Sequence, residues 1–255
     1  MNRLNQLSKF ATVFVVLSLT AGCASTPKQL TAPSPDDPWE STNRSIYAFN
    51  QTVDRTVLRP VAQTYDRITP KPAKAGISNF FDNLASPWIT GNLFLQGRFT
   101  AGSEQFGRFL INTVYGVGGV FDIAAQNNLP DYDTDLGVTL AYWGWKDSRF
   151  IMLPIFGPAT IRDGVGRITE MAVDPVDQAF RDRTGPGVIV LDVVQARAGF
   201  LGLDQTLEEA YDPYAFVRDG WLQRRNFQIF GEEAGMPDYD AFLEDDLEDI
   251  PEGKP

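Results

Sequence analysis

Apolar side chains recur every three to four positions along most of the chain after residue 37, which is the period of an α-helix and not of a β-strand. The clearest series are Ile46, Phe49, Val53 and Val57, and then Phe106, Phe109, Leu110 and Val114. Polar residues occupy the opposite side of each series. The sequence therefore predicts a mainly α fold, with few or no strands, over residues 38–230.

Prolines set the expected boundaries of these helices. Asp37 precedes Pro-Trp-Glu, which is typical of an N-cap followed by a first helical turn. Pro60 should break or kink the first helix, and Ser86 before Pro87 should start a new one. Pro154 favours an extended loop over 150–156, where a short strand is the alternative. The long helical stretch 204–230 should break near Pro213.

The two ends of the chain differ in composition from this helical body. Residues 1–22 combine a basic start, a ten-residue apolar run and small residues, as signal peptides do. The only cysteine, Cys23, follows at the position where a bacterial lipoprotein is cut and lipidated. Residues 23–37 read as a lipidated flexible tether, and 231–255, with ten acidic residues and one basic residue, as an acidic tail. Ala24, instead of an aspartate, favours sorting to the outer membrane over retention at the inner one.

Composition excludes several classes of function. The chain has no histidine, which removes a histidine base or ligand, and one cysteine cannot form a thiolate metal cluster. A net charge of −11 disfavours nucleic-acid binding. The glycines of 116–119 lack the third glycine of a dinucleotide loop, and the aspartates of 131–135 lack the remaining EF-hand ligands. We expect no enzyme activity, no cofactor and no metal.

The direction in which the amphipathic stripes face stays open at this stage. The series from Phe106 to Val114 could point into a protein core, with Glu104, Arg108 and Asn112 in water. It could instead point outward into acyl chains, with the polar side chains facing a wet interior. The periodicity is the same in both cases.

Ten short motifs occur in a fixed order through residues 37–227. They lie at residues 37–44, 47–50, 59–62, 76–84, 95–97, 108–113, 116–122, 136–144, 153–163 and 212–214. Taken together, and following the cysteine, they resemble the MlaA/VacJ family of outer-membrane lipoproteins. One departure from the family pattern is the segment 145–150, Trp-Lys-Asp-Ser-Arg-Phe, where the family usually continues glycine-rich. The flexibility of that loop here is an open question.

The resemblance implies a ring-like helical body that lies in the periplasmic, inner leaflet of the outer membrane and surrounds an amphipathic channel. Phospholipids misplaced in the outer leaflet would leave through it and pass to a periplasmic carrier, MlaC. Trimeric porins are the implied partners in the membrane. The rival interpretation is a structural outer-membrane lipoprotein that acts as a scaffold or tether. A phospholipase is disfavoured because no nucleophile–base pair is present.

The resemblance also supplies candidate site residues. Cys23 is the lipidation site. The candidates for channel lining or gating are Asn43, Arg44, Tyr47, Phe49, Asn50, Arg108, Asn112 and Arg162, with Gly116, Gly118, Gly119 and Gly144 for tight turns or loop motion. Arg108, Asn112 and Arg162 suit structural caps or ion pairs equally well, and Phe49 suits a core position. If Arg108 lines a channel, Arg108→Ala should leave the fold intact and raise phospholipid in the outer leaflet.

Overall fold

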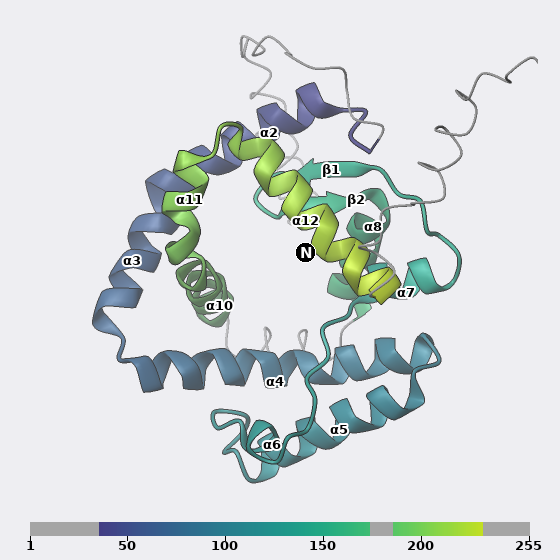
Figure 1. The fold of residues 1–255 in the computed structure, drawn as a ribbon. Coiled ribbons are helices and arrows are strands. Elements are labelled where there is room, and N and C mark those ends of the chain that lie inside the picture. The colour runs from purple at the N-terminus through teal and green to yellow at the C-terminus, as the bar shows by residue number, and fades with distance from the viewer. Residues whose placement is uncertain (1–35, 174–185, 232–255) are drawn as a thin grey trace, which may run out of the picture. The chain divides into compact units, whose positions relative to one another are not determined.

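The computed structural model describes residues 36–173 and 186–231 (Figure 1). The predicted signal peptide (1–22), Cys23, nearly all of the predicted tether (23–37) and nearly all of the predicted acidic tail (231–255) lie outside the described residues, so these predictions are not tested. The prediction of a mainly α fold is confirmed, because every described element is helical apart from one two-stranded sheet.

The first helical arm continues past the position where the sequence predicted a break or a kink. Helix α2 (Glu40–Val53) passes into a π-helical turn, η1 (Asp54–Leu58), and on into α3 (Arg59–Ile68). Pro60 lies in the first turn of α3, where the missing N–H costs little. The predicted cap is wrong: α2 starts after Trp39 without a side-chain cap, and Asp37 is instead fully buried.

The next two helices form a tightly packed antiparallel pair. Helix α4 (Lys71–Leu95) turns through Gly97 into α5 (Phe99–Val114), and the short α6 (Ile123–Gln126) follows. The helix start predicted at Ser86 is wrong, because Pro87 lies inside α4. Ser86 does not cap an N-terminus there. Its hydroxyl donates back to the carbonyl of Asp82 at 3.0 Å, so it belongs to a continuing helix.

The second half of the chain contains the only sheet among the described residues. Helix α7 (Leu136–Tyr142) leads to β1 (Phe150–Leu153) and β2 (Gly157–Thr160), an antiparallel pair in which Phe150 lies opposite Thr160. The prediction of a loop over 150–156 is therefore wrong for its first part: Pro154 follows β1 and lies in the turn, where it removes no ladder bond.

After the sheet, the elements of the described residues are all helical. They are α8 (Ile161–Val173), α10 (Pro186–Gly199), the 3₁₀ turn η2 (Leu201–Leu203), α11 (Asp204–Glu209) and α12 (Pro213–Phe230). The predicted break near Pro213 is confirmed, since Asp212 caps α12.

The contacts between these elements close a circuit. Helix α3 contacts α10, α10 contacts α4, and α4 contacts α7. Helix α7 contacts α8, α8 contacts β2, and β1 returns to α2 (Figure 1). The ring-like body implied by the resemblance, and its position in a membrane leaflet, stay predictions. Within the described residues, no helix combines the length and the apolar character that crossing a bilayer needs.

A small aromatic core fixes one side of the circuit. Phe150, Met152 and Tyr214 are buried together where β1 meets α2 and α12. Tyr214 packs edge-on against Tyr47, and Phe150 packs edge-on against Trp221. Segments more than 60 residues apart in the sequence therefore meet at this core.

The turn after α5 depends on glycines. Gly118 and Gly119 have φ of 70° and 92°, a region that other L-residues avoid. A Cβ on Gly119 would lie 2.5 Å from the Cβ of Asn83, whereas a Cβ on Gly118 would meet nothing within 4 Å. The predicted tight turn is present, and loop motion at this turn stays a prediction.

Two glycine variants should separate backbone strain from steric clash. Gly118→Ala should lower the free energy of unfolding by about 1 kcal/mol, from the left-handed backbone alone. Gly119→Ala should lower it by about 3 kcal/mol, because the clash with Asn83 adds to the same strain. Denaturant unfolding of both variants in detergent measures this difference. Equal losses would show that α4 does not pack on the turn as described.

Candidate functional site

Helix α5 has its polar side buried and its apolar side exposed. Gln105, Arg108 and Asn112 are 1%, 8% and 6% exposed. On the other side, Leu110 and Val114 are 44% and 67% exposed. Of the two orientations that the periodicity left open, the structure has the one in which the apolar side of α5 faces outward. The polar side chains, however, bond to other protein groups and do not line a wet interior.

The same inversion extends over the described part of the chain. Its buried polar and charged residues outnumber its buried hydrophobic residues, the reverse of an ordinary globular interior. Large apolar side chains stay exposed on most helices. Examples are Ile68, Phe99, Ile168 and Val190. Exposed apolar surface on this scale is typical of an interface with lipid or with another protein.

Arg108 and Asn112 both bind Asp122 in the turn that follows α5. Arg108 forms an ion pair with Asp122 at 2.5 Å and donates to the carbonyl of Leu129 at 3.1 Å, and Asn112 donates to the other Asp122 oxygen at 3.0 Å. Burial works to raise the pKa of Asp122, but bonds from the Ala125 N–H, Asn112 and Arg108 outweigh burial and hold that pKa below its ordinary value. The carboxylate therefore stays ionised and keeps the turn closed against α5.

A second cluster joins the start of α2 to the start of α12. Asn43 donates to Asp37 at 2.7 Å, and the Tyr214 hydroxyl donates to the other Asp37 oxygen at 2.5 Å. Arg44 binds both oxygens of Asp212, at 3.0 and 2.6 Å, and lies 4.4 Å from the centre of the Tyr214 ring. The bidentate bond from Arg44 lowers the pKa of Asp212, and burial with the bond to Asp37 raises the pKa of Tyr214.

The remaining α2 candidates lie in three places: against the hairpin, in the aromatic core and on the outside. Asn50 donates to the carbonyl of Leu153 at 2.9 Å and accepts from the N–H of Ile155 at 2.7 Å. It thus holds Ile155 at a φ of 69°, a strained value for a β-branched residue. Tyr47 packs in the aromatic core. Phe49, which is 45% exposed, is not part of that core.

Arg162 anchors the loop that departs from the family pattern. Its side chain is 2% exposed and donates to the carbonyls of Trp145 and Lys146, each at 3.0 Å. Gly144, at a φ of 109°, turns the chain into this loop. Burial lowers the pKa of Arg162, and Asp163 beside it works in the opposite direction. The loop is therefore fixed at its start by a buried guanidinium.

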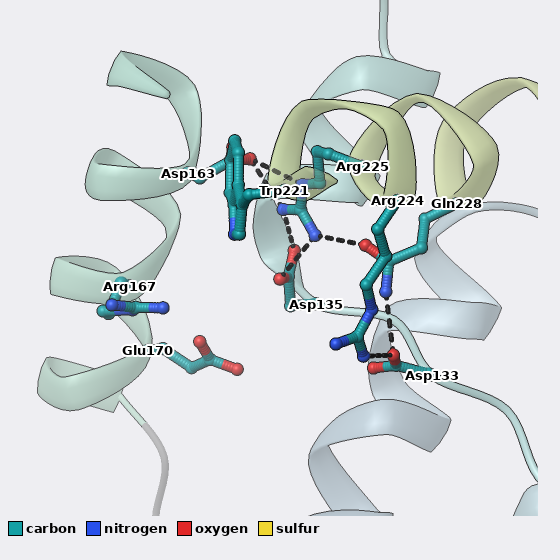
Figure 2. A pocket seen from close by; sticks show the side chains of 9 residues that line it. All are labelled: Asp133, Asp135, Asp163, Arg167, Glu170, Trp221, Arg224, Arg225 and Gln228. Atoms are coloured by element: carbon teal, nitrogen blue, oxygen red, sulfur yellow. Dashed lines mark hydrogen bonds and ion pairs between the residues drawn. The ribbon is translucent and has the colours of Figure 1, made fainter. Parts of the chain in front are cut away.

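Sequence reasoning missed a charged cluster centred on Arg225. Arg225 of α12 binds Asp135 through two nitrogens, at 2.9 and 2.7 Å, and binds Asp163 of α8 at 2.6 Å (Figure 2). Burial works to raise the pKa of Asp163, but Arg225 lowers it, so the carboxylate stays charged. Asp135 also caps α7 by accepting from the N–H of Val138. Only the cap was readable from sequence, since nothing local marks Arg225 as the partner.

A pocket of about 210 Å³ opens beside this cluster (Figure 2). Its wall carries charges of both signs, together with Trp221. Among the described residues, no group of histidine, cysteine, aspartate and glutamate side chains is arranged to hold a metal ion.

The fold and these clusters define a class of protein: a mainly helical body that pairs its charges inside and exposes its apolar side chains. Comparison with known families is more specific. The family model described as MlaA lipoprotein matches residues 35–228, and the chain belongs to that family.

Relatives and a solved structure agree with this assignment. Intermembrane phospholipid transport system lipoproteins MlaA from Shigella flexneri and Escherichia coli K12 are 36% and 35% identical to the chain over 240 residues, which is 91% of this chain and 94% of theirs. The protein of the same description from Haemophilus influenzae is 31% identical over 82% of this chain and 85% of its own length. A solved structure described as "Structural basis for maintenance of bacterial outer membrane lipid asymmetry" superimposes with a TM-score of 0.67 at 34% identity, covering 76% of this chain and 98% of that one.

The burial of Arg108 changes the outcome expected for its removal. Arg108→Ala should lower the free energy of unfolding by about 3 kcal/mol, because it removes a buried guanidinium that pairs with the Asp122 carboxylate. This variant should therefore weaken the fold instead of leaving it intact. Arg224→Ala is the matched control, since Arg224 and Asp133 are 66% and 67% exposed and their pair should contribute less than about 1 kcal/mol. Denaturant unfolding compares the two, and similar losses would contradict the assignment of Arg108 to a structural pair.

Proposed function

We propose that this protein is an outer-membrane lipoprotein that moves phospholipids. On this proposal it extracts phospholipids mislocalised in the outer leaflet through an amphipathic channel and passes them to a periplasmic carrier, MlaC, which maintains lipid asymmetry. Trimeric porins would be its partners in the membrane, and a lipid on Cys23 would anchor it at the periplasmic face. Membership of the MlaA family and the names of the relatives support the role.

The observation that carries the proposal is the inverted polarity of α5. A soluble scaffold would turn Leu110 and Val114 inward, because each exposed apolar side chain forgoes burial energy of about 25 cal/mol per Å². Here those side chains lie outside while arginine and asparagine occupy the inside. Acyl chains are the partner that makes this arrangement favourable.

The closed circuit of contacts suits such a task. A phospholipid headgroup is charged, and a bilayer's hydrocarbon core of about 30 Å opposes its passage. A polar-lined path through the body would lower that barrier without a covalent step. No catalytic group is needed, which fits a chain that has no histidine.

On this proposal the sequence candidates act mainly by positioning. Arg44, Asn43 and Asn50 join α2 to α12 and to the hairpin, and Arg108 fixes the turn after α5. They keep the circuit closed around the lipid path. Contact between their side chains and lipid stays a prediction, as does gating by the 145–150 loop, which Arg162 holds at its start.

A charge on the exposed face of α5 should separate this function from a scaffold. In cells that lack the protein, outer-leaflet phospholipid should rise and the wild-type chain should restore it. Leu110→Asp should fail to restore it, because a carboxylate placed among acyl chains is costly. Leu110→Ala, which keeps the position apolar, should succeed. Chemical labelling of surface phospholipid on intact cells measures this, with immunoblots to show equal protein levels.

The opposite result identifies the rival function. If the protein is a tether or scaffold, a charge at an exposed position is tolerated, and Leu110→Asp restores lipid asymmetry as well as the wild type does. Unchanged surface phospholipid in cells without the protein would contradict the transport role itself.

A further inference from the structure

Exposed aromatic and apolar side chains gather where the end of α7 meets the end of α4. The indole N–H of Trp143 donates to the carbonyl of Leu95 at 3.0 Å, which holds the two helix ends together (Figure 1). Phe99, the first residue of α5, packs against Phe94 with the ring centres 6.2 Å apart. These four side chains and that of Trp145 are between 40% and 68% exposed, and we call them the aromatic corner.

The backbone of this corner is held on both sides of Trp145. The N–H of Trp145 donates to the carbonyl of Leu140 at 3.0 Å. The buried Arg162 donates to the carbonyls of Trp145 and Lys146, each at 3.0 Å. The aromatic side chains are therefore presented from an ordered backbone, and such a surface loses little conformational entropy when it meets a partner.

The charge of the sequence changes abruptly after Trp145. Residues 136–145 contain no charged side chain, whereas Lys-Asp-Ser-Arg follows at 146–149. Lys146 and Asp147 are exposed. A bilayer has the same division where its hydrocarbon meets its headgroups, and tryptophan is enriched at that boundary because its ring is apolar and its N–H is polar.

The apolar side of the corner continues onto α5. Phe99, Phe106 and Leu110 recur at helical spacing, so they share one face of that helix, and all three are exposed. The proposed function places this face among acyl chains. A bilayer would therefore cover the corner and α5 as one surface, and the flexible stem of Lys146 lets its ammonium reach lipid phosphates beside it.

We propose that the aromatic corner lies at the boundary between the acyl chains and the headgroups of a phospholipid bilayer, with Lys146 at the lipid phosphates, and anchors the chain at that depth. The inference rests on the lipid environment proposed above and adds a fixed depth to it. It also gives the segment that departs from the family pattern a role of its own, because Trp145 stands where a glycine-rich continuation is usual.

The native tryptophans can report this depth. The full-length chain is reconstituted without porin in vesicles of phosphatidylethanolamine and phosphatidylglycerol. The difference in emission between the wild type and Trp143→Phe, Trp145→Phe or Trp221→Phe isolates each tryptophan. Bromines near the headgroup end of the acyl chains should quench Trp143 and Trp145 about twofold more than bromines near the methyl end. Trp221, which packs against Phe150 in the core, should be quenched little by either.

Two results of this measurement would overturn the anchor. Equal or stronger quenching by bromines near the methyl end would place the corner within the hydrocarbon. Quenching by neither lipid would place the corner outside the bilayer, which is the result expected if a protein partner covers it.

Flotation with the same vesicles tests the charge and the ring separately. All variants of the full-length chain carry Cys23→Ser, so that a lipid on the cysteine does not mask their differences. Lys146→Gln should lower the affinity about fivefold, the effect of one cation at a lipid surface. Trp145→Gly should lower it about tenfold, because the buried area of the ring is lost. Lys74→Gln and Tyr211→Ser are the matched controls and should bind as the Cys23→Ser chain does.

The controls remove the same groups where no anchor is proposed. The ammonium of Lys74 already pairs with Asp66, and Tyr211, which is 98% exposed, lies between Glu209 and Asp212 in the chain. Unchanged affinity in either corner variant, or equal losses in the controls, would contradict the anchor.

These outcomes stand apart from the proposed function. Quenching of the corner by bromines near the headgroups, with no change of surface phospholipid in cells lacking the protein, would contradict transport and leave the anchor standing. Restored lipid asymmetry by a chain whose corner is not quenched would do the reverse.

Discussion

Pairing of buried or partly buried arginines with aspartates is the interaction on which this structure depends. The helices meet through polar faces, and a charge taken from water without a partner costs several kcal/mol. Each of these charges has a partner: Arg44 pairs with Asp212, Arg108 pairs with Asp122, and Arg225 pairs with Asp135 and Asp163. Two of these clusters also join segments 60 or more residues apart in the sequence. The pairs therefore decide which elements lie next to one another.

The apolar surface follows from the same constraint. Once the polar sides of the helices are bonded to each other, the apolar sides remain outside, as Leu110 and Val114 show. Such a surface in water favours association, whereas acyl chains cover it at no cost in lost hydrogen bonds. The family membership and this polarity thus both support a lipid environment for the apolar surface. Together they give the lipid-transport proposal its physical basis.

The sequence predicted helices well because periodicity is local. It predicted the α5 stripe correctly but not the direction in which it faces, since the spacing is the same for either orientation. It failed where a distant partner determines the local structure. Asp37 resembled a helix cap, yet its carboxylate is buried against Asn43 and Tyr214. Pro87 resembled a helix start, yet α4 continues through it. Arg225 carried no local signal at all.

The candidate residues show the same limit. The family resemblance found Arg44, Arg108 and Arg162, and the structure shows what each side chain binds. Their partners lie up to 168 residues away, so no short motif could report them. By contrast, the glycines of 118 and 119 could be assigned to a turn from residue type alone, because few other residues adopt their backbone angles.

The orientation of α5 in a bilayer tests the central claim most directly. Spin labels on Phe106→Cys, Leu110→Cys and Val114→Cys variants, reconstituted in phospholipid, report collisions with dissolved oxygen and with a water-soluble nickel chelate. The inverted polarity predicts high oxygen and low chelate accessibility at all three positions, because all three side chains face acyl chains. High chelate accessibility at these positions would show that the apolar side of α5 faces water, and would contradict the account.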